Sequence, residues 1–149
     1  MRTLLIFLFT LGLFGSVHAA DSIVKVLPFF LDQQGRAAQS PSLFDRDAYQ
    51  AQLRENAGEV SAIRYDVLWK AAKNPTEKTL IRVELRGVGE RGLPKLKTLE
   101  TEVTPRHFRK WTSLTLGGDD YKKFGSVVAW RVTLWRGSRQ LGEQKSFLW

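Results

Sequence analysis

The chain has 149 residues, of which 43% are hydrophobic and 26% are charged, and its formal net charge is +8. This composition is typical of a folded globular protein rather than a disordered tail, and the length accommodates one domain of ordinary size. The absence of cysteine excludes disulfide bonds, thiolate metal sites, a cysteine nucleophile and a lipid-modified N-terminal cysteine.

The N-terminal segment has the layout of a secretory signal peptide. Arg2 supplies a positive charge, an apolar run extends from Leu4 to Phe14, and Val17-His18-Ala19 suits a cleavage site. The run is about eleven residues long, whereas a membrane-spanning helix needs about 20, and no second long apolar segment follows. We therefore predict a signal peptide over 1–19 and a single domain over 20–149, secreted or periplasmic, with no transmembrane helix in the mature chain. An uncleaved anchor is the alternative.

The first predicted strand of the mature chain is Ile23–Leu31, which is apolar and rich in β-branched residues. Asp32-Gln33-Gln34-Gly35 closes it as a turn. Pro28 lies inside the run and has no amide hydrogen, so the strand is expected at the edge of a sheet.

A helix is predicted over Asp45–Glu55, after a break at Ser40-Pro41-Ser42. Asp45 is expected to cap its N-terminus, and Phe44 to pack against Tyr49. Tyr49 and Leu53 share one face of the helix at a spacing of four residues. Its amphipathicity is weak, so we expect the helix to lie over one edge of a sandwich.

From residue 61 onward, apolar and polar side chains alternate, as expected for antiparallel strands with one buried and one solvent-exposed face. Gly87–Lys97 is predicted to be a loop and Tyr121–Phe124 one helical turn. With the first strand, the count is seven strands and one inserted helix, without the βαβ alternation of parallel sheets. The predicted fold is therefore all-β, a sandwich of two antiparallel sheets. The later strands are expected at 61–70, 81–86, 98–104, 111–116, 127–135 and 139–149.

Tyr121, a few residues before the Val127–Trp135 strand, resembles the corner tyrosine of immunoglobulin-like and fibronectin-III-like sandwiches. Trp69 would be their core aromatic between the sheets. The likeness covers residues 23–149 by strand count, although the chain lacks the cysteine pair of antibody domains and carries an inserted helix. The pattern also resembles small exported bacterial proteins of unknown function. The resemblance implies an immunoglobulin-like fold and no particular activity, because such sandwiches host many unrelated functions.

Two features are similar to cofactor or catalytic motifs. Gly87–Gly92 matches G-x-G-x-x-G after a strand, but Leu93-Pro94 follows where a dinucleotide site needs a helix N-terminus, so we interpret the segment as a loop. His107 is the one histidine outside the predicted signal peptide, and it has neither further metal ligands nor a G-x-S-x-G serine. We expect no cofactor, no metal and no catalytic residue.

The acidic residues also receive a structural interpretation. Glu100 and Glu102 share one strand face with Cα atoms about 6.6 Å apart, a spacing that overlaps the carboxylates of inverting glycosidases. Both side chains point the same way, however, so we expect them to pair with basic residues across the strands. Asp119-Asp120 is interpreted as a turn rather than a calcium site.

The basic surplus gives the one candidate binding site. Arg82 and Arg86 are expected on the solvent face of one strand, and Arg131 and Trp135 on that of another, if Val128, Trp130, Val132 and Leu134 face inward. These strands are neighbours in an immunoglobulin-like topology, which predicts one exposed patch with Glu84 among the arginines. Arginine binds carboxylate, sulfate or phosphate, and an indole binds a sugar ring or a cation. The alternative is an ordinary solvated face, in which Arg131 stacks on Trp135 and Glu84 screens the other charges.

The sequence thus predicts a non-enzymatic exported module of the cell envelope that binds a partner protein or an anionic polymer. Nucleic acid fits the charge but not the compartment. One alternative is a small outer-membrane β-barrel, suggested by the alternating strands and the terminal Phe147-Leu148-Trp149, although such barrels have eight or more strands. Another is a polymer hydrolase that would use Glu100 and Glu102. If the last strand is central in its sheet, deleting 147–149 is expected to cost several kcal/mol.

Overall fold

The computed structural model describes residues 21–72, 77–105 and 108–149. The predicted signal peptide and His107 lie outside these residues. Two short 3-10 turns, Ala57–Glu59 and Glu90–Gly92, accompany the main elements. The main elements in chain order are β1 (Ser22–Asp32), α1 (Leu43–Glu55), β2 (Val60–Lys70), β3 (Thr79–Val88), β4 (Pro94–Val103), β5 (Lys110–Gly117), α2 (Gly118–Phe124), β6 (Ser126–Arg136) and β7 (Arg139–Lys145).

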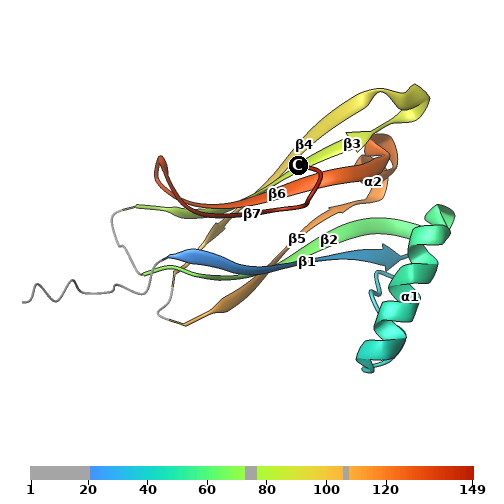
Figure 1. Cartoon of the computed structure of the whole chain (residues 1–149), viewed down its shortest axis with the longest axis horizontal. Helices are drawn as coiled ribbons and strands as arrows, with labels where there is room; N and C mark the ends of the chain where they lie inside the picture. The colour runs from blue at the N-terminus through green and yellow to red at the C-terminus, as the bar shows by residue number, and fades with distance from the viewer. Residues whose placement is uncertain (1–20, 73–76, 106–107) are drawn as a thin grey trace, which may run out of the picture.

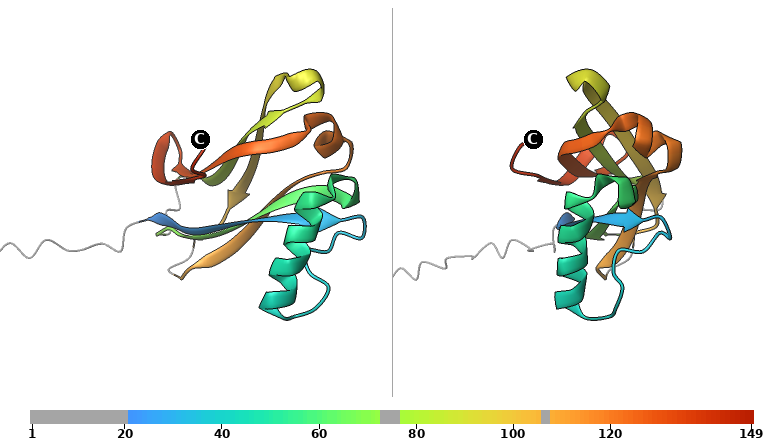
Figure 2. Two further views of the ribbon diagram at one scale, coloured as in Figure 1. Left: turned by 45° about the vertical axis from the view of Figure 1, so that its right-hand side comes forward. Right: turned by 90° about the vertical axis from the view of Figure 1, so that its right-hand side faces the viewer.

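The strands form two antiparallel sheets that pack face to face (Figures 1 and 2). The three-stranded sheet has the order β1-β2-β5, and the four-stranded sheet has the order β4-β3-β6-β7. The predicted all-β sandwich, with a helix between the first and second strands, is confirmed. The fourth strand pairs with the third, whereas in constant-type immunoglobulin domains it joins the sheet of the first, second and fifth strands.

The core lies between the sheets and is apolar. Alternate residues of β2, β3 and β6 point into it, and Trp69 is among the most deeply buried. The Trp69 indole N–H donates a hydrogen bond to Thr112 Oγ1 at 2.9 Å, so its polar group is satisfied. Because the chain has no cysteine, burial of this apolar layer holds the sheets together, at about 1.5–3 kcal/mol for each large side chain.

Helix α1 covers the free edge of β1 with a side-chain amide. The N–H of Phe30 donates to Gln50 Oε1 at 2.8 Å, and Gln50 Nε2 donates to the carbonyl of Phe30 at 2.9 Å. These are the two bonds that a neighbouring strand would otherwise make. β1 is an edge strand, as Pro28 predicts, and α1 lies at this edge as expected.

The start of α1 differs from the prediction in two respects. The helix begins at Leu43, and its N-cap is Ser42, whose hydroxyl accepts a hydrogen bond from the N–H of Asp45. A serine three residues ahead of an acidic residue suits the capping position better than the aspartate itself. Phe44 is 82% exposed and therefore does not pack on Tyr49. Tyr49 and Leu53 are both buried, as predicted.

The loop predicted at Gly87–Lys97 is a tight hairpin between β3 and β4. β3 continues to Val88 and β4 begins at Pro94, so only five residues connect them. Arg91 and Gly92 both adopt the left-handed conformation, with φ of 61° and 75°. Such residues allow the chain to reverse in a short space, and this conformation is not evident from hydrophobic periodicity.

The end of the chain also departs from prediction. β7 is an edge strand that ends at Lys145, so the last strand is neither central nor extended to the C-terminus. In β6, the register shifts opposite Arg86 and Gly87, and Val128 is consequently exposed rather than directed inward. The extra residue is a β-bulge, which period-two counting cannot place.

A buried carboxylate at the end of β1 ties this strand to α1. Asp32 is 3% exposed and accepts hydrogen bonds from the Tyr49 hydroxyl at 2.7 Å and from Arg36 Nε at 2.8 Å. It also accepts bonds from the backbone N–H groups of Gln34 and Arg36, each at 2.8 Å. Burial alone would raise the pKa of Asp32, but these donors together lower it from 3.8 to about 2.

We expect Asp32→Asn to lower the free energy of unfolding by about 2 kcal/mol near neutral pH. Since the folded-state pKa is depressed, the contribution is present above the ordinary value of 3.8 and is lost as the pH falls toward about 2. Urea unfolding at several pH values should show the difference between the two proteins shrinking across this interval. Tyr49→Phe, which removes one donor, is expected to cost about 1 kcal/mol. A difference that does not vary with pH would contradict this account.

Tyr65 gives a second prediction. Its ring packs edge-on against Trp130 with centroids 6.1 Å apart, and its hydroxyl is buried without a hydrogen-bond partner among the described residues. Burial raises the pKa of this phenol. Because an unpaired buried hydroxyl is destabilising, Tyr65→Phe should raise the free energy of unfolding by about 1 kcal/mol. A clear loss of stability in urea titrations would show that the hydroxyl has a partner.

Candidate functional site: the outer face of the four-stranded sheet

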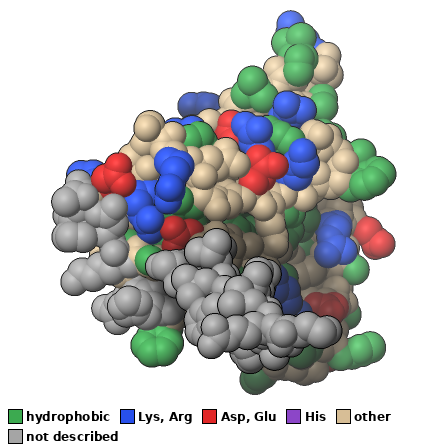
Figure 3. Space-filling view, turned by 60° about the vertical axis from the view of Figure 1, so that its left-hand side comes forward, with side chains coloured by type: hydrophobic (Ala, Val, Ile, Leu, Met, Phe, Trp, Pro, Cys, Tyr) green, Lys and Arg blue, Asp and Glu red, His purple; other side chains and the backbone are tan. Residues whose placement is uncertain are grey.

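The pairing of β3 with β6 places the predicted patch on one face. Glu84 lies opposite Arg131, and Arg82 lies opposite Thr133. The residues between them on both strands point into the core, so the side chains of Arg82, Glu84 and Arg131 point to solvent. We call this surface the arginine face; it comprises Arg82, Glu84, Arg86, Glu100, Arg131, Trp135 and Trp149. Figure 3 shows basic and acidic side chains close together over the four-stranded sheet, which is the upper layer in this view.

Two of the three arginines are in ion pairs. Arg131 donates to both carboxylate oxygens of Glu84, at 2.8 and 2.9 Å, and this hydrogen bonding raises the pKa of the guanidinium. Arg82 donates to Glu100 on β4. Arg82, Glu84, Thr98 and Glu100 line a shallow hollow in the sheet surface. An anion that entered this hollow would compete with carboxylates already in place.

Tryptophan rings cover the arginines, but not in the predicted arrangement. The guanidinium of Arg82 lies 5.2 Å from the centre of the Trp135 ring. Arg131 stacks on Trp149 at 4.8 Å, and not on Trp135 as the alternative of an ordinary solvated face had it. The register explains this. Trp135 lies opposite Leu80, so Arg82, two residues along β3 on the same face, is its diagonal neighbour, whereas Arg131 is four residues away along β6.

Trp149 is a site residue that the sequence did not reveal. After β7, the N–H of Ser146 donates to the carbonyl of Trp130 at 2.9 Å, and the N–H of Trp130 donates to Ser146 Oγ at 3.0 Å. This turn directs the C-terminus across the arginine face. The Trp149 ring lies 4.0 Å from the Arg86 guanidinium, and no periodic signal in the sequence predicts that contact.

Arg86 differs from the other two arginines. It is exposed, and none of the described residues offers it a carboxylate partner. Leu96, which lies opposite it on β4, is 79% exposed, and Val88 and Val128 are exposed as well. The arginine face therefore has a neutralised part around Arg82 and Arg131 and a cationic, apolar part around Arg86.

The other acidic residues pair with bases. Glu100 accepts from Arg82, and Glu102 lies 2.9 Å from the ammonium of Lys78, as expected for cross-strand partners. Asp120, in the first turn of α2, lies 2.7 Å from Lys97, and this ammonium lowers its pKa. Within 21–72, 77–105 and 108–149, no three histidine or acidic side chains gather in a way that could hold a metal ion.

The G-x-G-x-x-G segment serves packing. A β-carbon on Gly87 would lie 2.4 Å from the Phe124 ring, so the glycine permits α2 to approach β3. The strand β4 follows the segment, as expected, and no helix begins there.

The chain matches no protein-family model, no curated protein and no solved structure. Neither helix in the described part of the chain combines the length and apolar character that a membrane span requires.

The contacts of Trp149 predict the effect of truncation. Deleting Phe147–Trp149 should lower the free energy of unfolding by about 1 kcal/mol. The deletion removes the contacts of the Trp149 ring with Arg86 and Arg131, whereas β7 remains paired with β6. Phe147→Ala is the control and should have no effect, since Phe147 is fully exposed. Thermal and urea unfolding measure both variants. A loss of several kcal/mol on truncation would mean that the terminus is part of the core.

Proposed function

We propose that the protein is an exported, non-enzymatic binding module of the cell envelope, and that it binds a partner protein or an anionic polymer through the arginine face. The signal-peptide layout of the sequence supports export, and the formal charge of +8 supports an anionic ligand. The observation that carries the proposal is Arg86, an exposed arginine stacked on an indole and without a carboxylate partner among the described residues.

The stacking of Arg86 favours binding in two ways. A guanidinium that lies flat on an aromatic ring keeps the N–H groups at its edge available for carboxylate, sulfate or phosphate. The stack also restricts the side chain before the ligand arrives, which reduces the entropy lost on binding.

The surroundings of Arg86 favour a specific contact over a purely electrostatic one. Leu96, Val88 and Val128 add exposed apolar surface next to the guanidinium and to Trp149. Arginine and tryptophan beside apolar side chains are typical of the residues that dominate protein interfaces. Because Arg82 and Arg131 already bind Glu100 and Glu84, we assign them a smaller share of the binding energy.

The same ion pairs support a role without catalysis. A hydrolase needs one carboxyl group protonated and the other free to act on water or on the sugar. Glu100 and Glu102 are each held by a base on the neighbouring strand.

Arg86→Gln tests the proposal on a dextran sulfate column eluted with salt. We expect this variant to elute at clearly lower salt than the wild type, because the available guanidinium is lost. Arg139→Gln, which removes the same charge from the exposed first residue of β7, is the matched control and should shift elution much less. Equal shifts for the two variants would show that net charge alone accounts for the binding, and would refute a site at Arg86.

Glu84→Gln gives the opposite prediction. The substitution removes the negative charge beside Arg131 and one of the two oxygens that accept its hydrogen bonds, so the variant should be retained to higher salt than the wild type. Because the gain of one net charge also raises retention, the control is Asp47→Asn, which likewise removes a carboxylate from an arginine, Arg46, but on α1. Retention no stronger than that of the control would exclude Arg131 from the site.

A further inference from the structure

We propose that the protein has a second interaction surface, on the opposite sheet, and that this surface docks onto a membrane rich in anionic phospholipid. The surface lies where β5 begins. We call it the basic aromatic end, and it comprises Lys25, Lys70, Phe108, Arg109, Lys110 and Trp111. This inference does not depend on the proposed function of the arginine face.

Strand register brings these residues together from three separate segments. Leu68 on β2 lies opposite Lys25 on β1 and opposite Trp111 on β5, so the three form one row across the outer face. Neighbouring strands are about 4.8 Å apart, which puts the backbones of Lys25 and Trp111 roughly 10 Å from each other. Lys70 lies two residues farther along β2, on the same face and toward the same end.

The start of β5 adds two aromatic and two basic residues in a row. Phe108 is 82% exposed and Trp111 is 48% exposed, although both side chains are large and apolar. Arg109 and Lys110 lie between them and are exposed as well. The sequence Phe108-Arg109-Lys110-Trp111 thus presents aromatic rings and cations at one end of the sandwich.

The charges at this end are not neutralised as they are on the arginine face. Among the described residues, none of the four cations has an ion-pair partner. The nearby carboxylates are occupied. Asp66 binds Arg64 at 2.9 Å and Ser113 at 2.6 Å, and Asp21 binds Arg136 at 3.1 Å. The basic aromatic end therefore keeps its positive potential.

The combination of side chains favours a lipid surface as the occupant. The indole of Trp111 suits the level of the lipid headgroups, because its ring is apolar and its N–H can stay hydrated. The wholly apolar ring of Phe108 suits insertion at the boundary between headgroups and acyl chains. Cations at the same level are attracted to anionic headgroups. The two rings project from the end of a sheet, and the shallow hollow of the protein lies on the other sheet. Projecting rings suit a fluid interface, which has no fixed shape to match.

The test is cosedimentation with vesicles of phosphatidylcholine, with and without phosphatidylglycerol. Protein purified after export is used, so that the predicted signal peptide does not contribute. We expect binding to the anionic vesicles only, weakened by salt, together with a blue shift of tryptophan fluorescence that Trp111→Phe reduces.

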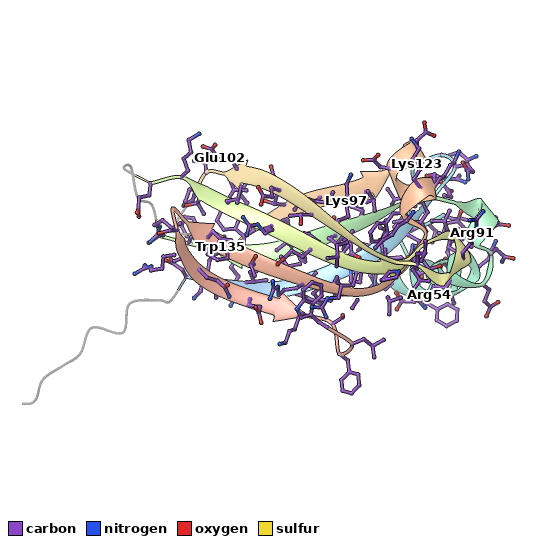
Figure 4. All side chains as sticks on the ribbon, turned by 90° about the horizontal axis from the view of Figure 1, so that it is seen from above. Arg54, Arg91, Lys97, Glu102, Lys123 and Trp135 are labelled. Atoms are coloured by element: carbon purple, nitrogen blue, oxygen red, sulfur yellow. The ribbon has the colours of Figure 1, made fainter. Side chains whose placement is uncertain are left out.

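Matched variants locate the surface. Phe108→Ala should lower the affinity for anionic vesicles about tenfold. Phe44→Ala should have no effect, because Phe44 is equally exposed, at 82%, but lies on α1 at the far end of the molecule. Lys70→Gln should lower the affinity about fivefold. Lys123→Gln, at the end that also carries Arg91 and Arg54 in Figure 4, should change it much less.

Three results would overturn the proposal. The first is equal vesicle binding by wild type and by the Phe108 and Lys70 variants. The second is no binding to anionic vesicles by folded wild-type protein, with circular dichroism as the check on folding. The third is binding of poly-glutamate, but not of vesicles, through the same residues, which would identify an acidic polypeptide as the occupant. Arg86→Gln should leave vesicle binding unchanged, so failure of this proposal and failure of the arginine face are distinguishable.

Discussion

The apolar layer between the two sheets determines where the charges of this protein can lie. An unpaired charge in that layer would be costly, so the alternating residues of β3 and β6 must place every arginine outside. Among the described residues, two ionised groups are buried nevertheless, Asp32 at the end of β1 and Arg136 at the end of β6, and each is held by partners at the margin of the core. Without disulfide bonds, this separation of apolar and charged residues is what gives the fold two opposite polar faces.

The features that depend on short-range periodicity could be predicted from the sequence. Apolar and polar residues alternate over most of β3, of β2 from Ile63 onward and of β6 beyond its bulge, so the outward positions of Arg82 and Arg131 followed directly. The exceptions depend on single backbone conformations. The bulge at Val128 shifts the register of β6, and the left-handed Arg91 allows the tight turn between β3 and β4; neither has a periodic signature.

Pairing of Glu100 and Glu102 with basic residues could be predicted, but not the identity of the partners, because it depends on register between distant segments. Arg82 and Glu100 are eighteen residues apart in sequence, and Arg131 and Glu84 are 47 apart. A shift of two residues in either pairing would have left all four side chains on the same face with different partners. The basic aromatic end has the same origin, since Lys25, Lys70 and Trp111 meet only through the order β1-β2-β5. The compact run Phe108-Arg109-Lys110-Trp111 was the one local signal for it.

The two surfaces differ in the range over which they act. On the arginine face, Glu84 and Glu100 cancel most of the field of Arg131 and Arg82. The binding that we propose there therefore depends on direct contact with Arg86 and its apolar neighbours. At the basic aromatic end, unpaired cations extend their attraction to about one Debye length. The surfaces belong to different sheets of a sandwich and face away from each other. Occupation of one surface therefore does not block the other, which suits the role that we propose, a module that holds a ligand next to a membrane.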